Sequence, residues 1–524
     1  MYAKVESLGL NGLDAFSVTV EADISTGLPR FDIVGLPDMA VRECRERVRA
    51  TIKNGGYQFP VSRMTVNIAP ADVKKEGAVY DLPVFVALMK ASGQIHGSTD
   101  GCAFLGELSL DGEIRPCTGV LPMVLCAREK GLHAVFVPAA NRDEGSIVEG
   151  IDVLPVAHVR QVLDHLQGKV PVEPCYRAFS PEEDTLEYLD FADVKGQQNA
   201  KRALEIAAAG GHNCLMIGPP GTGKSMLAKR LPSILPEMTF EEQIETTKIY
   251  SIAGALPSGT RLISHRPFRS PHHTVSPQGL TGGGAVPKPG EISLAHNGVL
   301  FMDEFPEFDR RTKESLRQPL EDGVITISRA GGSLTYPSNI MVVAAMNPCP
   351  CGFLGHPTKD CTCSQAAVNR YRDKVSGPIL DRIDLHVEVQ SVDYAQLADT
   401  TRGEPSSAIR QRVNRARQMQ AQRFAGTGFT QRAEKGRQPG GHILRCWFDP
   451  VDGTAEFRKP FRLFFRFQLR QDNGQNGGFQ IASGPGCRQQ LEQFFLDALC
   501  RDAVQMRPQC PGSNTGGWVD GKAE

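Results

Sequence analysis

The segment GPPGTGKS at residues 218–225 restricts the fold of this chain more than any other feature of its sequence. It follows the apolar stretch NCLMI and precedes SMLAKRLPSIL, which has helical periodicity. The backbone N–H groups of a Gly-rich turn between a strand and a helix point inward and bind phosphate oxygens. The pattern therefore predicts a parallel α/β domain that binds a nucleotide. We call residues 218–225 the phosphate loop.

Each position of the phosphate loop is a candidate contact for the nucleotide. Lys224 is expected to reach the β- and γ-phosphates, and the hydroxyl of Ser225 is expected to bind Mg²⁺. The alternative is a Gly-rich turn that binds no nucleotide. The candidate residues are Gly218, Pro219, Pro220, Gly221, Thr222, Gly223, Lys224 and Ser225.

An apolar segment that ends in two acids lies downstream of the phosphate loop. GVLFMDEF at residues 298–305 places Asp303 and Glu304 at the end of a buried strand. We expect Asp303 to hold Mg²⁺, directly or through water, and Glu304 to polarise the attacking water. Solvated acids are common at strand ends, so this assignment depends on the presence of the phosphate loop in the same chain.

Two further polar residues are candidates for the same site. The apolar segment IMVVAAMN ends at Asn347, whose side chain could orient the attacking water or simply cap a turn. The segment SGPILDRIDLHVEV places Arg382 between two acids. Its guanidinium could neutralise charge on the transferring phosphoryl group, in its own subunit or in a neighbour's, or it could form a surface ion pair with Asp381 or Asp384.

Four of the fourteen cysteines lie close together, in CPCGFLGHPTKDCTC. They form two C-x-C pairs, Cys349 with Cys351 and Cys361 with Cys363. Thiolates are typical ligands of structural Zn²⁺, and a loop that contains glycine can fold around a tetrahedral ion. We expect a structural zinc site with His356 as a substitute ligand, and four free thiols are the alternative.

The composition is that of a cytoplasmic protein of several domains. The 524 residues include 58 Lys and Arg and 59 Asp and Glu, which gives a formal net charge of -1. A surface for nucleic acid would therefore be a local patch. The sequence lacks a long apolar run and a secretory signal, so we expect no membrane span and a reducing environment for the cysteines.

Changes in periodicity and composition divide the chain into five parts. Residues 1–166 alternate strand-like and helical segments and are expected to form an α+β domain. Residues 167–190 have the composition of a linker, and residues 191–400 combine apolar strands with helices as parallel α/β domains do. Residues 401–430 contain a basic helix. Residues 431–524 form an atypical tail that holds both Trp and nine of the 25 Phe.

Two loops carry basic residues that could contact DNA phosphates. VITISRAGGSLTYP predicts a hairpin whose tip lies at residues 329–332, where Arg329 would meet a phosphate regardless of base sequence; a solvated turn is the alternative. The second loop is rich in Gly and Pro. Metal binding by its two histidines is disfavoured, because adjacent side chains diverge in an extended segment. Its candidates are Arg266, Arg269, His272 and His273.

A predicted helix from Ser406 to Arg423 is a third candidate for binding DNA. At helical spacing, Ile409 and Val413 share an apolar face, and the arginines flank that face on both sides. A solvated basic helix is the alternative. The arginines are Arg410, Arg412, Arg415, Arg417 and Arg423.

Several of these segments together resemble the YifB/ComM family of magnesium-chelatase-like AAA+ ATPases. The resemblance extends over about residues 1–430 and includes GHNCLMIGPPGTGKS, NGVLFMDEFPEF, AAMNPCPCG and SGPILDRIDLHVEV. It implies a role for each candidate: Walker A for Lys224 and Ser225, Walker B for Asp303 and Glu304, sensor 1 for Asn347 and a trans-acting arginine finger for Arg382.

The resemblance also implies an activity and an assembly. Members of this family form hexameric rings that bind ATP and Mg²⁺ between subunits, and the competence-associated members are implicated in helicase or branch-migration work on DNA. A metal-insertion motor of the magnesium-chelatase type is the alternative. The N-terminal domain ahead of the motor favours the YifB/ComM arrangement.

The N-terminal segments KKEGAVYDLPVFVAL and GELSLDGEIRPCTGVLPMVLCA resemble the proteolytic domain of Lon-type proteases. Lon-type chemistry needs a serine nucleophile and a lysine that removes its proton. The resemblance places Val79 where the serine is needed and Leu121 where the lysine is needed. We therefore expect a folding and docking domain with no peptidase activity.

The tail leads to the first prediction. Family members end in a helical lid whose sensor 2 arginine reaches the nucleotide, and the resemblance implies that residues 401–430 are the start of this lid. The resemblance stops after RQMQAQRFAGTGFTQ, as a shifted reading frame would cause, so we expect the rest of the lid to be absent. A divergent C-terminal domain is the alternative. We predict weak ATP turnover, poor assembly and rapid proteolysis after about residue 431. Mass spectrometry of a limited digest and light scattering test this, and a protease-resistant tail on a stable, strongly active hexamer would contradict it.

Overall fold

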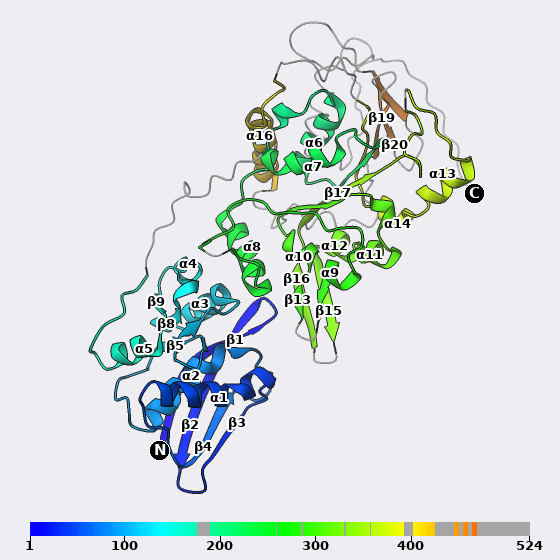
Figure 1. Cartoon of the computed structure of the whole chain (residues 1–524). Coiled ribbons are helices and arrows are strands. Elements are labelled where there is room, and N and C mark those ends of the chain that lie inside the picture. Colours follow the sequence, from blue (N-terminus) through cyan, green and yellow to red (C-terminus); the bar gives the residue numbers. More distant parts are fainter. Residues whose placement is uncertain are drawn as a thin grey trace, which may run out of the picture.

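The computed structural model places two β-sheets of different topology along the chain (Figure 1). It describes residues 1–175, 189–257, 259–284, 287–329, 332–356, 358–391 and 402–424, together with three strands between residues 445 and 468. The predicted linker at 167–190 and the predicted tail at 431–524 therefore lie partly outside the described residues. None of the described helices is long and apolar enough to cross a membrane.

The N-terminal sheet is mixed and seven-stranded, with the order β3-β4-β2-β1-β5-β8-β9. β1 and β2 form a long antiparallel hairpin, whereas β5, β8 and β9 run parallel to β1. The strands are β1 (Tyr2–Asn11), β2 (Asp14–Ser25), β3 (Arg30–Val34), β4 (Arg63–Ala69), β5 (Cys102–Phe104), β8 (Ala134–Pro138) and β9 (Asp152–Val156), with the short pair β6 (Glu107–Leu108) and β7 (Ile114–Arg115) outside the sheet.

Five helices accompany the N-terminal sheet, and the predicted helices of this part are confirmed. In α1 the Asp38 side chain accepts the N–H of Val41 at 2.8 Å, and Gly55 follows the last turn. Arg47 on α1 donates to the fully buried Asp81 at the start of α2 at 2.5 and 3.0 Å, because a buried carboxylate needs a charged or hydrogen-bonding partner. The helices are α1 (Met39–Asn54), α2 (Asp81–Ala91), α3 (Val120–Glu129), α4 (Arg142–Gly145) and α5 (Val159–Leu166).

The second sheet is parallel from β11 to β19, in the order β11-β14-β17-β10-β18-β19-β20-β21. The residues of β14 are all buried, as expected of a strand covered on both faces. The parallel α/β fold predicted for residues 191–400 is thus present. The strands are β10 (Cys214–Ile217), β11 (Phe268–Arg269), β14 (Gly298–Met302), β17 (Ile340–Met346), β18 (Leu385–Glu388), β19 (Arg445–Asp449), β20 (Thr454–Arg458) and β21 (Phe464–Gln468).

Helices and two small strand pairs surround the parallel sheet. The predicted hairpin forms, with β15 (Val324–Arg329) paired to β16 (Gly332–Pro337), and a second pair joins β12 (Gly282–Gly283) to β13 (Lys288–Pro289). The helices are α6 (Gln198–Gly210), α7 (Lys224–Arg230), α8 (Phe240–Ala253), α9 (Pro277–Thr281), α10 (Glu291–Leu294), α11 (Arg310–Glu314), α12 (Arg317–Asp322), α13 (Gln365–Arg372), α14 (Gly377–Leu380) and α16 (Ser406–Phe424).

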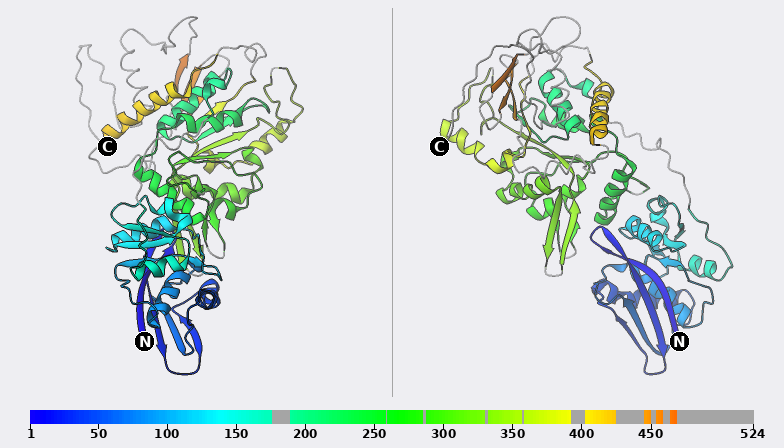
Figure 2. Two further views of the ribbon diagram at one scale, coloured as in Figure 1. Left: turned by 60° about the vertical axis from the view of Figure 1, so that its left-hand side comes forward. Right: turned by 180° about the vertical axis from the view of Figure 1, so that it is seen from behind.

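A buried carboxylate joins the N-terminal part of the chain to α8, which lies between the two sheets (Figures 1 and 2). Glu144 accepts the N–H of Leu121 at 2.8 Å, the side-chain amide of Asn141 at 3.1 Å, and the hydroxyl of Ser251 on α8. Burial raises the pKa of Glu144, and these hydrogen bonds oppose the rise. The Ser251 hydroxyl is therefore one of several donors that stabilise a costly buried acid.

The tip of the β1–β2 hairpin makes a second contact between the two parts. A Cβ atom on Gly12 would lie 3.2 Å from Cδ2 of Leu334 on β16, and Gly12 has a positive φ of 66°. Leu13 packs against the apolar cluster that contains β14 and β17 residues. The N-terminal part thus contacts both α8 and the β15–β16 hairpin.

We predict measurable energetic coupling between Glu144 and Ser251. In a double-mutant cycle of Glu144→Ala and Ser251→Ala, the coupling energy should be about 1–3 kcal/mol, because each single change leaves a buried polar group without its partner. Chemical denaturation measures the free energy of unfolding. Thr247 on α8 is a matched control, since its hydroxyl bonds to Gln243 instead. Equal coupling of Glu144 to Thr247 and to Ser251 would contradict the prediction.

Candidate functional site

Parallel strand pairing brings the predicted nucleotide-site residues to one edge of the sheet. Ile217, the last residue of β10, pairs with Met346, the last residue of β17, and β14 is the parallel neighbour of β17 on its other side. The carboxyl ends of parallel strands share an edge, which is the usual place for a ligand site in such a sheet. The phosphate loop after β10, Asp303 after β14 and Asn347 after β17 therefore lie next to one another.

Glycines allow the backbone of the phosphate loop to turn in a small space. A Cβ atom on Gly218 would lie 2.2 Å from the carbonyl oxygen of Val389, so no side chain fits at this position. Gly221 and Gly223 have φ values of 80° and 89°, in the left-handed region that glycine adopts at little cost. The loop then leads directly into α7, as the strand–loop–helix pattern predicted.

The side chain of Lys224 is buried and directed back over the phosphate loop. Its Nζ donates to the carbonyl oxygens of Gly218 at 2.7 Å and Pro219 at 2.9 Å, and to Oδ1 of Asn347 at 3.3 Å. Burial lowers the pKa of Lys224, and the charge of Asp303 opposes this effect. Because these nearest acceptors are neutral, a phosphate group at this position would gain a strong charge-assisted interaction.

Ser225 and Asp303 bring two oxygen ligands together beside Lys224. The hydroxyl of Ser225 donates to Oδ2 of Asp303 at 2.6 Å, and Oδ1 of the same carboxylate accepts the backbone N–H of Glu304 at 3.0 Å. A hydroxyl and a carboxylate are the hard oxygen ligands that Mg²⁺ prefers. These two residues fit the predicted metal role.

Glu304 is exposed and contacts a histidine that the sequence suggested for another role. Its backbone adopts a positive φ of 52°, which is uncommon outside glycine. Its Oε2 lies 3.2 Å from Nδ1 of His273, and the ring of His273 lies 4.1 Å from the ring of His272. His273 was a candidate for binding DNA, yet it faces the predicted water-activating carboxylate. Its position after β11, the neighbour of β14, is the signal that could have placed it here.

Gln197 is a polar contact of the phosphate loop that sequence reasoning missed. It precedes α6 with a φ of 56°, and its side-chain amide donates to the carbonyl oxygens of Thr222 at 3.1 Å and Gln390 at 2.6 Å. It therefore ties the loop to the segment that follows β18. Its residue type alone gives no signal for this role, because the two acceptors come from distant parts of the sequence.

Arg382 makes a different set of contacts from the residues beside Lys224. Its guanidinium forms an ion pair with Glu321 on α12, and Nη1 donates to the carbonyl oxygen of Pro378 at 2.5 Å. Glu321 also accepts from Arg317 at 3.0 Å. Burial lowers the pKa of Arg382, and the neighbouring charge of Arg317 adds to this effect. The sequence did not indicate Glu321 as its partner.

The four cysteines converge as the sequence predicted. Sγ of Cys349 lies 3.3 Å from that of Cys351 and 3.6 Å from that of Cys361, and all four sulfurs, with that of Cys363, lie within 4.8 Å of one another. Sulfurs bound to one tetrahedral zinc at about 2.3 Å are separated by about 3.8 Å. The N–H of Phe353 and the neighbouring thiols lower the pKa of Cys351 to about 6, whereas the pKa of Cys361 and that of Cys363 are raised by hydrogen bonds among the same thiols and by burial.

His356 does not join the sulfur cluster as the predicted substitute ligand. Its Nδ1 accepts the backbone N–H groups of Thr358 and Lys359, both at 3.2 Å. Within the described part of the chain, the possible metal site here is formed by the four cysteines alone. The donor set is therefore four thiols, which fits zinc.

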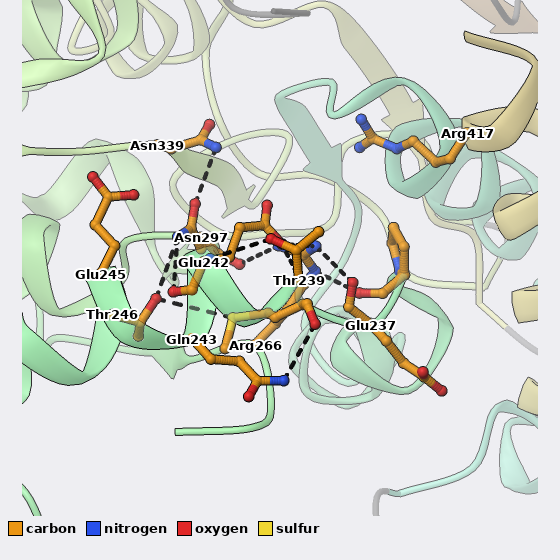
Figure 3. A network of polar contacts seen from close by, with 12 residues as sticks. Glu237, Thr239, Glu242, Gln243, Glu245, Thr246, Arg266, Asn297, Asn339 and Arg417 are labelled. Atoms are coloured by element: carbon orange, nitrogen blue, oxygen red, sulfur yellow. Dashed lines mark hydrogen bonds and ion pairs between the residues drawn. The ribbon is translucent and has the colours of Figure 1, made fainter. Parts of the chain in front are cut away.

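Arg266 is a structural residue, not the exposed DNA contact that the loop composition suggested. Its guanidinium donates to the carbonyl oxygens of Pro236 at 2.5 Å and Asn297 at 2.8 Å, and to Oε2 of Glu242 at 2.9 Å. Figure 3 shows it inside a polar network in which Asn297 also contacts Thr246. Each of its three guanidinium nitrogens donates to a group of the chain, as a partly buried guanidinium requires.

Arg269 is likewise engaged within the chain. It forms a bidentate pair with Glu291, with Nε and Nη2 each 2.7 Å from a carboxylate oxygen. This pairing raises the pKa of Arg269. The two arginines of the Gly- and Pro-rich loop thus hold the loop to the body of the domain.

The apolar face predicted for α16 is confirmed, and residues on the other side of the helix, including Arg412 and Arg415, are exposed. Ile409 and Val413 are buried against residues of α6 and the parallel sheet. Arg412 pairs with Glu205 at 2.6 Å and with Glu404, whose carboxylates raise its pKa. Arg410 donates to the carbonyl oxygen of Ser233 at 2.8 Å, and Arg417 donates to that of Ala208 at 3.1 Å. Arg415 is exposed. The side chain of Arg423 lies outside the described residues.

Two other predictions meet different outcomes in the structure. The side chain of Arg329, at the tip of the β15–β16 hairpin, lies outside the described residues, so its role stays a prediction. Val79 and Leu121, from the two Lon-like segments, pack in one apolar cluster. Neither of these two side chains carries an ionisable group.

Comparisons with known proteins match most of the chain. The model of the family described as "Magnesium chelatase, subunit ChlI" matches residues 190–397, and that described as "Subunit ChlI of Mg-chelatase" matches residues 20–141. The chain is 44% identical over 420 residues to the uncharacterized protein YifB of Escherichia coli, covering 79% of this chain and 81% of YifB.

Two further relatives differ in how much of the chain they match. The competence protein ComM of Haemophilus influenzae is 43% identical over 435 residues, which cover 80% of this chain and 83% of ComM. The magnesium-chelatase 67 kDa subunit of Chlorobaculum parvum is 28% identical over 167 residues, which cover 30% of this chain and 23% of that protein. The similarity to ComM is thus both higher and far more extensive.

Proposed function

Because this chain belongs to the YifB/ComM family of magnesium-chelatase-like AAA+ proteins, we propose that it hydrolyses ATP with Mg²⁺ to move on or remodel DNA. The observation that carries the ATPase proposal is the 2.6 Å hydrogen bond between Ser225 and Asp303. It joins the end of the phosphate loop to the acidic end of β14. Phosphoryl transfer depends on positioned charges of this kind more than on covalent chemistry by the protein.

Each residue of the site has a role that follows from its contacts. Ser225 and Asp303 would hold Mg²⁺, which when bound neutralises negative charge on the phosphate oxygens. Lys224 would exchange its carbonyl acceptors for phosphate oxygens. Glu304, which is exposed, would orient and polarise the attacking water, and Asn347 would help to place that water while it holds Lys224.

We propose that Arg382 acts on the nucleotide of a neighbouring copy in those molecules that assemble into a ring of six. Its ion pair with Glu321 lies in its own chain, away from the contacts of Lys224 and Ser225. A neighbour's phosphates would compete with Glu321 for the guanidinium. Arginine supplied from a neighbouring subunit stabilises charge that develops on the transferring group.

We also propose that Cys349, Cys351, Cys361 and Cys363 bind one structural Zn²⁺. Their sulfurs are within 4.8 Å of one another, and the four thiols complete a tetrahedral shell with no open position for a reactant. The zinc would thus stabilise the loop and would take no part in hydrolysis.

The DNA part of the proposal rests on the competence protein ComM and on the hairpin β15–β16. Most candidate arginines are already paired inside the chain, including Arg266, Arg269 and Arg412. The hairpin tip near Arg329 is therefore the remaining loop candidate. Its contacts would be to phosphates, which carry no base sequence.

We predict that Glu304→Gln lowers the rate of ATP hydrolysis by a factor of about 10² or more while nucleotide affinity is kept, because the amide cannot polarise water but leaves the phosphate contacts in place. Phosphate release and equilibrium binding of an ATP analogue measure the two quantities. Glu307→Gln is a matched control, since this nearby exposed acid pairs with Lys374 at 2.9 Å. Unchanged turnover in Glu304→Gln would refute the assignment.

We further predict that single-stranded DNA stimulates ATP hydrolysis and that the stimulation falls as salt is raised, because phosphate contacts dominate such binding. The ATPase rate is measured across salt concentrations, together with particle size. A tetrapyrrole-loaded partner subunit serves as the competing stimulus. If it stimulates hydrolysis and DNA does not, the chain is a metal-insertion motor of the magnesium-chelatase type and the DNA proposal fails.

A further inference from the structure

The loop that carries the cysteines leaves β17 directly beside the phosphate loop. Asn347, the first residue after β17, accepts from Lys224 Nζ at 3.3 Å. Cys349 follows two residues later and is fully buried. The first ligand of the proposed metal site is therefore two residues away from a side chain that contacts the lysine of the phosphate loop.

A second contact between the two loops lies immediately after Cys351. Gly352 is buried, and a Cβ atom on it would lie 2.7 Å from Cδ of Pro220 in the phosphate loop. The N–H of Gly352 donates to the carbonyl oxygen of Cys349 at 3.0 Å, which closes a tight turn between the two cysteines. The backbone next to a metal ligand thus packs on the phosphate loop itself.

The second pair of cysteines approaches this turn from a firmly packed element. Cys363 is followed by Ser364, whose hydroxyl accepts the N–H of Ala367 at 3.3 Å and caps α13. Tyr371 of α13 is buried in the same apolar cluster as residues of β14 and β17. All four cysteines are free thiols. A metal ion bound by both pairs could therefore link the segment before α13 to the turn that packs on the phosphate loop.

We propose that the metal held by the four cysteines keeps the turn at Cys349–Gly352 pressed against the phosphate loop, so that nucleotide affinity depends on the metal. The site takes a soft divalent cation such as Zn²⁺, which supports the nucleotide site through packing and not through chemistry. The inference rests on the proposed nucleotide binding and deepens it. The turn at Cys349–Gly352 would then line the proposed ATP site and support the phosphate loop.

The first test removes the metal from the full chain under reducing conditions. Wild-type protein should carry about one zinc per chain by elemental analysis. Zinc is stripped with a chelator, the chelator is removed, and a fluorescent ATP analogue is titrated in with Mg²⁺. The dissociation constant should rise at least tenfold and should return when Zn²⁺ is added back. Absence of zinc, or an unchanged dissociation constant after its removal, overturns the inference.

The second test separates the contact from the metal. Gly352→Ala keeps all four cysteines and places a methyl group against Pro220, so it should weaken analogue binding at least fivefold while the zinc content stays at that of wild type. Gly355→Ala is the matched control. Gly355 lies in the same loop with a similar φ of 77°, against 84° for Gly352, but has no atom within 4 Å of its Cβ position.

The outcomes distinguish the two proposals. If the wild-type chain binds no ATP analogue, or binds it equally well after Lys224→Ala, the proposed nucleotide site itself fails. If binding depends on Lys224 but Gly352→Ala and Gly355→Ala bind alike, the nucleotide site stands and the coupling fails. Circular dichroism confirms that each variant is folded. If Gly352→Ala loses zinc as well as nucleotide binding, the result contradicts the claim that the packing of Gly352 on Pro220 supports the nucleotide site.

Discussion

The parallel pairing of β10 with β17 and β18 is the constraint on which the candidate nucleotide site depends. It brings the residue after β10, Gly218, so close to the carbonyl oxygen of Val389 that a Cβ atom there would lie only 2.2 Å from it. The same register sets Asn347 beside the phosphate loop, where it meets Lys224. A side chain at position 218 would separate the strands and displace these groups together, because packed sheets deform little.

Several arginines of the magnesium-chelatase-like domain form ion pairs within the chain and so stabilise that domain. Arg266, Arg269 and Arg412 each meet a carboxylate, and Arg266 also donates to carbonyl oxygens. Removing such arginines would take a charged partner from half-buried or buried acids, so their loss would affect stability before it affected any ligand. The basic composition of a loop or helix is therefore a poor guide to a nucleic-acid surface until these internal pairs are known.

The N-terminal part contacts the magnesium-chelatase-like domain through a buried hydrogen bond and through apolar packing. Leu121 lies in an apolar cluster against which Val79 also packs, and the backbone N–H of Leu121 donates to the same Glu144 that binds Ser251 of α8. The β1–β2 hairpin reaches Leu334 on the hairpin β15–β16. These contacts involve both α8 and that hairpin. A movement of either element would therefore change the contacts of the N-terminal part.

The sequence by itself determined the local elements: the strand–loop–helix around the phosphate loop, the β15–β16 hairpin, the apolar face of α16 and the cysteine cluster. Each of these elements depends on residues close together in the sequence. Hydrophobic periodicity, the positions of glycines and the spacing of cysteines therefore predict them. Only the tertiary structure decided which distant groups meet, as His273 meets Glu304 and Arg382 meets Glu321. The reason is physical: a buried or half-buried polar group pairs with whatever partner the fold brings within hydrogen-bond distance, and no local pattern records that choice.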